Sequence, residues 1–194
     1  MLYLPPDFAH DGIALDCCMT YSIGFRAPLY RELAEAFLDH LRDSVNVPGR
    51  YADPDLRATR AAARIDARMR QRVARTLAQI RWDRGDVARF LGRHLTEPKP
   101  DVVFAPGPRR SRAEFRRSIG RAGVRLDRRT QLLYDDTRYY INGDDAPLPP
   151  SGAAALRKLA DLRALPPEDC AALSDEVIDM LHDWHRHGFL ADAA

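Results

Sequence analysis

Histidine side chains are candidate metal ligands in this chain, and three of its six histidines lie close together near the C-terminal end. His182 and His185 would share one face of a helix, and His187 follows them directly. Such a pair ligates a transition metal only when further Cys, His or carboxylate ligands complete the coordination shell. The sequence offers no carboxylate or Cys elsewhere to complete such a site. This favours a polar helix end, where protonatable side chains suit the helix dipole.

Cysteine indicates the redox setting rather than catalysis. Cys17 and Cys18 are adjacent and Cys170 is far away, a spacing that gives neither a disulfide framework nor a paired-Cys zinc site. No basic helix start lies beside Cys17 and Cys18 to lower the pKa of a thiol, so we assign them no catalytic role. The simplest setting for such cysteines is a reducing cytoplasm.

Hydroxyl side chains alternate along a β-prone segment, Ile13–Phe25. Thr20, Ser22 and Gly24 are two residues apart in turn, so they lie on one face of a strand, where they either line a pocket or fill an interior. Arg26 follows, and it either contacts a substrate or faces solvent at the end of the sheet. Both alternatives remain open from the residues alone.

The elements that must position these residues change in period along the chain. Met1–Pro6 is an apolar, strand-like run, and Asp16 marks a turn between two further strands. Because strands need neighbours to pair with, we expect sequence upstream of Met1 to be missing. Three helical stripes follow: Leu29, Leu33, Ala36, Phe37 and Leu41, with a helix end near Ser44; Ile65, Met69, Val73, Leu77 and Ile80; and Val87, Phe90, Leu91 and Leu95. These stripes must be covered by each other or by a second subunit.

A Pro-rich stretch, 97–108, is the best candidate for a domain linker, so we place the start of a second domain near residue 101. The pattern beyond it predicts a helix, a small hairpin and two helices, which is the outline of a winged-helix module. The predicted elements are a helix over Ser111–Ala122, strands over Gln131–Tyr134 and Arg138–Ile141, a turn at Asn142-Gly143, a helix over Ala153–Leu162, and one helix from Pro167 toward Trp184 that stops at Gly188.

Charge is strongly segregated behind a net value of +2. Residues 1–56 carry a net −5, residues 57–138 a net +13 and residues 139–194 a net −6. The basic block 57–138 suits RNA or a ribosomal surface; alternatively, its arginines only solvate exposed helices. No apolar stretch is long enough to span a membrane, so we expect no membrane partner.

Two segments resemble the end of the catalytic barrel in bacterial ribosomal oxygenases, which are cupin-fold hydroxylases of the Jumonji C group. They are Leu2-Tyr-Leu-Pro-Pro-Asp-Phe-Ala-His10-Asp-Gly12 and Met19-Thr-Tyr-Ser-Ile-Gly-Phe-Arg-Ala-Pro28. The resemblance implies an α+β chain with the C-terminal strands of a barrel over 1–28, a helical dimerisation region over 29–100 and a winged-helix domain over 101–194. It therefore also implies a homodimer.

The same resemblance implies an enzyme that uses Fe(II) and 2-oxoglutarate to hydroxylate an arginine of a large-subunit ribosomal protein. His10 matches the distal iron ligand of a 2-His-1-carboxylate set, which leaves metal positions open for 2-oxoglutarate and oxygen. Thr20 and Ser22 lie where the family's last strand approaches cosubstrate or substrate, and Arg26 is the candidate substrate contact.

One departure limits this interpretation. The family supplies its other two ligands from a His-x-Asp pair, and no His-x-Asp or His-x-Glu occurs in this sequence. We therefore expect an internal start or a truncated gene model, and a chain that hydroxylates nothing as it stands. The alternatives are a non-enzymatic ribosome- or nucleic-acid-binding winged-helix protein, and an inactive remnant that dimerises through its helices.

Overall fold

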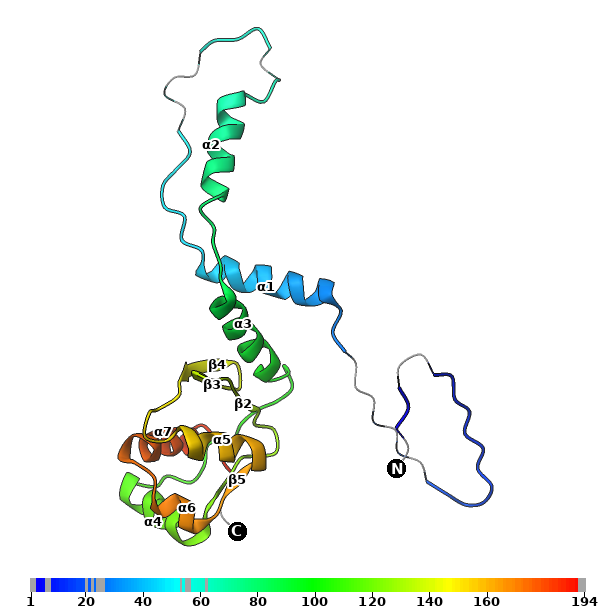
Figure 1. The fold of residues 1–194 in the computed structure, drawn as a ribbon, viewed down its shortest axis with the longest axis vertical. Coiled ribbons are helices and arrows are strands. Elements are labelled where there is room, and N and C mark those ends of the chain that lie inside the picture. The colour runs from blue at the N-terminus through cyan, green and yellow to red at the C-terminus, as the bar shows by residue number, and fades with distance from the viewer. Residues whose placement is uncertain are drawn as a thin grey trace. The chain divides into compact units, whose positions relative to one another are not determined.

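The computed structural model describes residues 3–5, 8–19, 21, 23, 27–52, 54, 57–61 and 63–191. Helices and strands are both present, in the order shown in Figure 1, so the α+β class is confirmed. The chain divides into two compact units, residues 1–36 and residues 37–194. Within the described residues, no helix is both long and apolar enough to cross a membrane.

The three helices predicted between residues 29 and 96 all form. They are α1 (Tyr30–Ser44), α2 (Ala67–Leu77) and α3 (Arg84–Thr96). Carboxylates fix the starts of the last two: Asp66 accepts hydrogen bonds from the N–H groups of Arg68 and Met69, and Asp83 forms a capping box with Asp86.

The apolar stripes of these helices have different environments, so the expectation that each is covered by another helix or by a second subunit is met within the chain only in part. On α3, Phe90 is buried, and the Phe37 ring packs edge-on against it with centroids 5.3 Å apart. On α2, the large apolar side chains remain exposed. An amphipathic pattern forms a helix with or without a partner for its apolar face, so the pattern alone did not separate these two cases.

Strands β2 (Leu132–Tyr134), β3 (Arg138–Ile141) and β4 (Asp144–Pro147) form an antiparallel three-stranded sheet. The first two strands confirm the predicted hairpin. The turn at Asn142-Gly143 was predicted, whereas β4 was not, because its sequence Asp-Asp-Ala-Pro has low strand propensity.

Helix α3 packs on this sheet and forms hydrogen bonds with the backbone of Gly143, in the turn between β3 and β4. The Thr96 hydroxyl accepts from the Gly143 N–H at 3.1 Å, and the Arg93 Nε donates to the Gly143 carbonyl at 2.8 Å. Gly92 lies directly against the Tyr140 ring, where a β-carbon would stand only 2.3 Å from ring atoms. Contacts of α3 therefore cross residue 101, where we placed the domain boundary.

The C-terminal core is built from helices around a second, two-stranded sheet. Helix α4 (Arg112–Ala122) leads into β1 (Val124–Arg125), which pairs with β5 (Ala164–Leu165), the strand that follows α5 (Ala153–Leu162). Leu126 and Leu190 form an isolated bridge beyond this pair. Phe115, Leu159, Val177, Ile178 and Leu181 are among the most deeply buried side chains.

The single helix predicted from Pro167 toward Trp184 is wrong. The chain forms two helices instead, α6 (Pro167–Ala171) and α7 (Asp175–Arg186). Ser174 separates them because its side chain accepts from the Val177 N–H and caps a new helix. Gly188 does follow the end of α7 with a φ of 77°, as predicted for a C-terminal cap.

The strands predicted over Met1–Pro6 and Ile13–Phe25 are not found among the described residues of those segments. Residues 15–17 form a bend around Asp16, and large apolar side chains nearby, such as those of Ile13 and Leu15, are exposed. An extended segment becomes a strand only when neighbouring strands satisfy its backbone groups, and β-propensity cannot supply those neighbours.

Candidate functional site

His10, the predicted iron ligand, lies in the N-terminal unit on an exposed segment without regular structure. Its Nδ1 is 3.3 Å from the carbonyl oxygen of Phe8. Thr20, Ser22 and Arg26, the predicted cosubstrate and substrate contacts, lie outside the described residues, so their assignment stays a prediction.

The residues that the structure describes do not fit an iron centre by themselves. A 2-His-1-carboxylate site needs three ligands on one face of the metal. Within the described part of the chain, no group of three or more His, Cys, Asp or Glu side chains is arranged to hold a metal ion. His10 is therefore one candidate ligand, and no reaction step through a metal follows from this geometry.

His182 and His185 have a structural role on α7 that sequence reasoning missed. The Nε2 of His182 is 2.8 Å from the Arg110 carbonyl oxygen, and the Nε2 of His185 is 2.9 Å from that of Pro108. A carbonyl only accepts, so each Nε2 carries the hydrogen. His185 is buried, contrary to the polar helix end that we predicted. The two rings hold the segment before α4 against α7, a contact between residues more than 70 positions apart.

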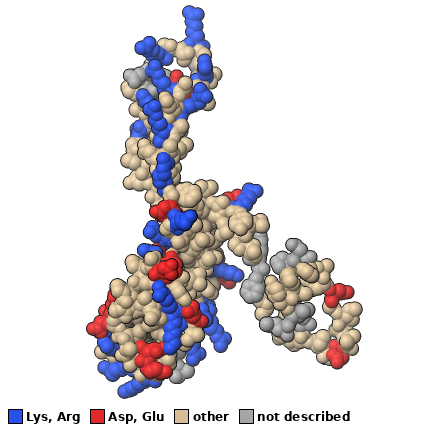
Figure 2. Space-filling model, viewed as in Figure 1, with Lys and Arg blue, Asp and Glu red and all other residues tan. Residues whose placement is uncertain are grey.

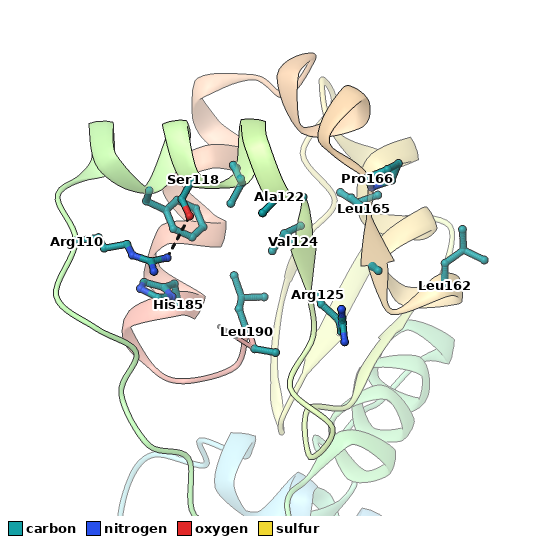
Figure 3. A pocket seen from close by; sticks show the side chains of 15 residues that line it. Arg110, Ser118, Ala122, Val124, Arg125, Leu162, Leu165, Pro166, His185 and Leu190 are labelled. Carbon is teal, nitrogen blue, oxygen red and sulfur yellow. Dashed lines mark hydrogen bonds between the residues drawn. The ribbon is translucent and has the colours of Figure 1, made fainter. Parts of the chain in front are cut away.

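A pocket of about 400 Å³ opens beside this contact. Figure 3 shows Arg110, Ser118 and His185 on one side of it and Arg125 and Leu162 on the other. Arg110 Nη1 donates to the Ser118 hydroxyl at 3.3 Å. The walls come from apolar residues of α4, β1 and β5, among them Ile119, Val124 and Leu165. Such a lining binds apolar groups and supplies few polar ones for catalysis.

Gly123 shapes this pocket because it ends α4 and turns the chain into β1. Its φ is 76°, and a β-carbon there would lie 2.3 Å from the Leu165 carbonyl oxygen. Only glycine allows both the left-handed backbone and this close approach.

Arginines of α4 fall into two groups. Arg112 forms salt bridges with Asp175 and Asp179, and Arg116 lies 2.5 Å from Asp175. Hydrogen bonds from Arg112 and then Arg116 lower the pKa of the Asp175 carboxyl. These pairs join α4 to α7.

The second group, Arg117 and Arg121, lies on another side of α4. Arg109, Arg110, Arg117 and Arg121 surround a shallow concavity with Glu114, Ser118 and Ala122. From the sequence we had instead singled out the basic block 57–138 and, as its phosphate contacts if it binds RNA, Arg68, Arg72 and Arg75 on the second helix. The signal that could have found this group is the spacing of Arg117 and Arg121, which lie about 140° around the helix from Arg112 and Arg116.

Comparison with protein-family models finds two matches. Residues 79–191 match the family described as ROXA-like winged helix, which is more than half of the chain, and residues 1–33 match the JmjC domain family. The winged-helix fold is therefore confirmed, and its match begins before α3, the helix that packs on the sheet. The boundaries 1–28, 29–100 and 101–194 stay predictions.

Known proteins resemble this chain in sequence and in fold. The ribosomal protein uL16 3-hydroxylase of Escherichia coli strain K12 is 30% identical over 106 residues, which are 55% of this chain and 28% of that protein. The structure of YcfD, a ribosomal oxygenase from Escherichia coli, matches with a TM-score of 0.62 and 22% identity over 87% of this chain and 48% of that one. YcfD in complex with cobalt and 2-oxoglutarate matches with a TM-score of 0.62 and 22% identity over 87% and 47%. The chain thus spans about half the length of the solved structures that it matches.

Proposed function

Because this chain belongs to the ROXA-like winged-helix family, we propose that its function is that of a ribosomal oxygenase. The proposed reaction is Fe(II)- and 2-oxoglutarate-dependent hydroxylation of an arginine in a large-subunit ribosomal protein. A cytoplasmic location accompanies this proposal, since newly made ribosomal proteins are found there.

One observation carries the proposal: a single chain holds a JmjC match at 1–33 and a ROXA-like winged helix at 79–191, in that order. The curated relative is a uL16 3-hydroxylase, and the solved relatives include complexes with cobalt and 2-oxoglutarate. Cobalt there stands in for iron. A winged helix alone would not favour hydroxylation, because that fold serves many functions.

The proposed site consists of His10 as one iron ligand, Thr20 and Ser22 beside the cosubstrate, and Arg26 beside the substrate. When bound, the iron would activate oxygen; the protein's part is to hold the ligands and orient the substrate. The sequence has no His-x-Asp pair, and the described residues lack a complete ligand group. We therefore expect no turnover from this chain on its own.

A fusion protein tests the proposal directly. A ribosomal-oxygenase barrel segment that carries a His-x-Asp pair is joined ahead of residue 1, and a uL16-type substrate is analysed by mass spectrometry for the gain of one oxygen atom. We expect hydroxylation that depends on 2-oxoglutarate, and its loss in His10→Ala.

The matched control is His187→Ala in the same fusion protein, since His187 is also exposed but lies at the end of α7. Full activity of the His10→Ala fusion would remove His10 from the ligand set. A folded fusion that binds the metal and leaves every ribosomal substrate unmodified would refute the proposed reaction.

We also propose that this chain forms a homodimer through the region 29–100. Support comes from α2, where Met69, Val73 and Leu77 form an exposed apolar stripe with no cover from the described residues. Exposed stripes of this kind mark protein interfaces. We expect sedimentation to show a dimer for the parent chain and a monomer for Val73→Glu, with unchanged helix content. A folded parent that is a monomer at high concentration contradicts the prediction.

A further inference from the structure

Helix α4 presents two faces of different electrostatic character. Arg112 and Arg116 face α7, where Asp175 and Asp179 neutralise them. Arg117 and Arg121 lie about 140° farther around the helix axis, and no salt bridge connects either of them to the described carboxylates. The same helix thus carries one neutralised and one positively charged face.

The charged face is concave. Arg109 and Arg110, just before the helix, join Arg117 and Arg121 around the concavity, so four arginines line it. Arg117 and Arg121 stand one helical turn apart, about 6 Å along the axis. Like charges at this spacing repel each other, and a bound anion relieves that repulsion.

Glu114 is the single acidic residue of this lining, and its carboxylate is already engaged. It accepts hydrogen bonds from the Ser111 N–H at 2.8 Å and from the Ser111 hydroxyl at 2.7 Å, as part of the capping box. These hydrogen bonds lower the pKa of Glu114, and Arg117 and Arg110 lower it further. The lining therefore keeps a clear excess of positive charge.

The chemistry of the lining favours a phosphodiester backbone over a protein partner. Protein interfaces depend on aromatic or aliphatic anchors, and Ala122 is the only apolar residue here. Arginine forks, by contrast, match phosphate oxygens in geometry and charge. A row of guanidinium groups without apolar anchors is typical of surfaces that follow a nucleic-acid backbone.

We propose that Arg109, Arg110, Arg117 and Arg121 form a docking surface for the sugar–phosphate backbone of RNA. The choice of RNA as the source of the phosphates rests on the proposed function, since a ribosomal oxygenase meets its substrate near RNA. The binding itself needs neither a metal nor turnover, so this surface and the hydroxylase activity can fail independently.

Helix α2 supplies the contrast within the same chain. It is also rich in arginine, and Figure 2 shows Lys and Arg side chains predominating on the visible face of α2 and the loop before it. Arg70 and Arg75 are exposed and lie on different sides of that helix, so they do not converge on one concavity. This pair thus carries the same charge as Arg117 and Arg121 without sharing a face of its helix.

The test measures binding of a fluorescently labelled oligouridylate to the whole chain by anisotropy at several salt concentrations. The variant is Arg117→Glu with Arg121→Glu, and the control is Arg70→Glu with Arg75→Glu, which changes the net charge equally. We expect the α4 variant to lose about tenfold or more in affinity and its log–log salt slope to fall by roughly 1.4, as for two lost single-strand phosphate contacts. The α2 control should stay within about threefold of the parent.

Two further variants keep the result interpretable. Arg117→Gln with Arg121→Gln removes the charges without adding acids, and should weaken binding even if the Glu variant unfolds. Glu114→Gln keeps the capping box, which accepts either residue, and should strengthen RNA binding.

Several outcomes would overturn the proposal. Equal losses in the α4 and α2 variants would show that only bulk charge matters. Polyglutamate bound as tightly as oligouridylate, with the same dependence on Arg117 and Arg121, would identify an acidic protein partner instead. Tighter binding of the matching DNA oligonucleotide would reject RNA as the source, and no binding by the folded parent would reject the surface.

Discussion

The N-terminal unit and the winged-helix domain bury their apolar side chains to opposite extents. Leu15, in the unit of residues 1–36, is 95% exposed, whereas Leu181 on α7 is fully buried. Both segments match known families and are rich in large apolar residues. A recognisable motif therefore accompanies a core in one unit and exposed side chains in the other.

The difference follows from how each kind of element is stabilised. Barrel strands depend on hydrogen bonds to neighbouring strands and on a shared interior, both of which are non-local. The winged-helix domain supplies its own partners: α4, α5 and α7 cover the β1–β5 pair, and α3 covers the three-stranded sheet. Family resemblance identifies an ancestry, and local packing decides which segment is held in place.

Truncation of one leucine in each unit tests this difference in burial most directly. Leu181→Ala removes a fully buried side chain and should lower the free energy of unfolding by about 2 to 5 kcal/mol. Leu15→Ala removes an exposed one and should change it by less than about 0.5 kcal/mol. Urea denaturation followed by circular dichroism measures both. Similar losses in the two variants would show that Leu15 is packed in solution.

Substitution of two helical glycines by alanine should change the stability of the winged-helix domain with opposite signs. Gly92→Ala should destabilise by about 1 to 3 kcal/mol, since the added methyl meets the Tyr140 ring. Gly120→Ala, where nothing lies within 4 Å of the new methyl, should stabilise by about 0.5 to 1 kcal/mol. Thermal unfolding of both variants gives the two signs. Unchanged stability in Gly92→Ala would mean that α3 does not pack closely against the sheet.

Acid should weaken the winged-helix domain through Asp135. Burial raises the pKa of its carboxyl, but hydrogen bonds from Tyr140, Thr137 and Arg138 outweigh it and lower the pKa from 3.8 to about 2. Because the folded pKa is depressed, the stabilisation is present above about pH 4 and is lost as the pH falls through about 2. After a discount for solvent screening of this partly exposed carboxyl, the contribution is on the order of 1 to 2 kcal/mol.

The free energy of unfolding between about pH 5 and about pH 2 measures this contribution. Asp135→Asn should flatten the pH dependence, and Tyr140→Phe should reduce it in part, because it removes the hydrogen bond of 2.5 Å between the Tyr140 hydroxyl and Asp135. An unchanged slope in Asp135→Asn would assign the acid sensitivity elsewhere.

The smallest expected effect concerns the N-terminal unit. Titration of the whole chain with Mn(II), followed by calorimetry, should show no saturable micromolar site, because His10 is one ligand where three are needed. His10→Ala should leave the trace unchanged. A micromolar site that disappears in His10→Ala would show that other residues complete the ligand set.

Local signals in the sequence were sufficient for most elements of residues 67–191. The sequence pattern predicted α2, α3, α4 and α5, and the turn residues predicted the β2–β3 hairpin. These features depend on residues only a few positions apart, such as Ser111 and Glu114 in the capping box of α4. The outline of a winged helix followed from their order alone.

Tertiary structure decided what those elements touch. In the folded chain α3 packs against Tyr140, a new helix begins after Ser174 where one long helix was predicted, and His185 is buried against the Pro108 carbonyl. It also divided the arginines of α4 into a face neutralised by Asp175 and Asp179 and a face that stays charged. Periodicity places an arginine on a side of its own helix, but it says nothing about which carboxylate another helix brings to that side.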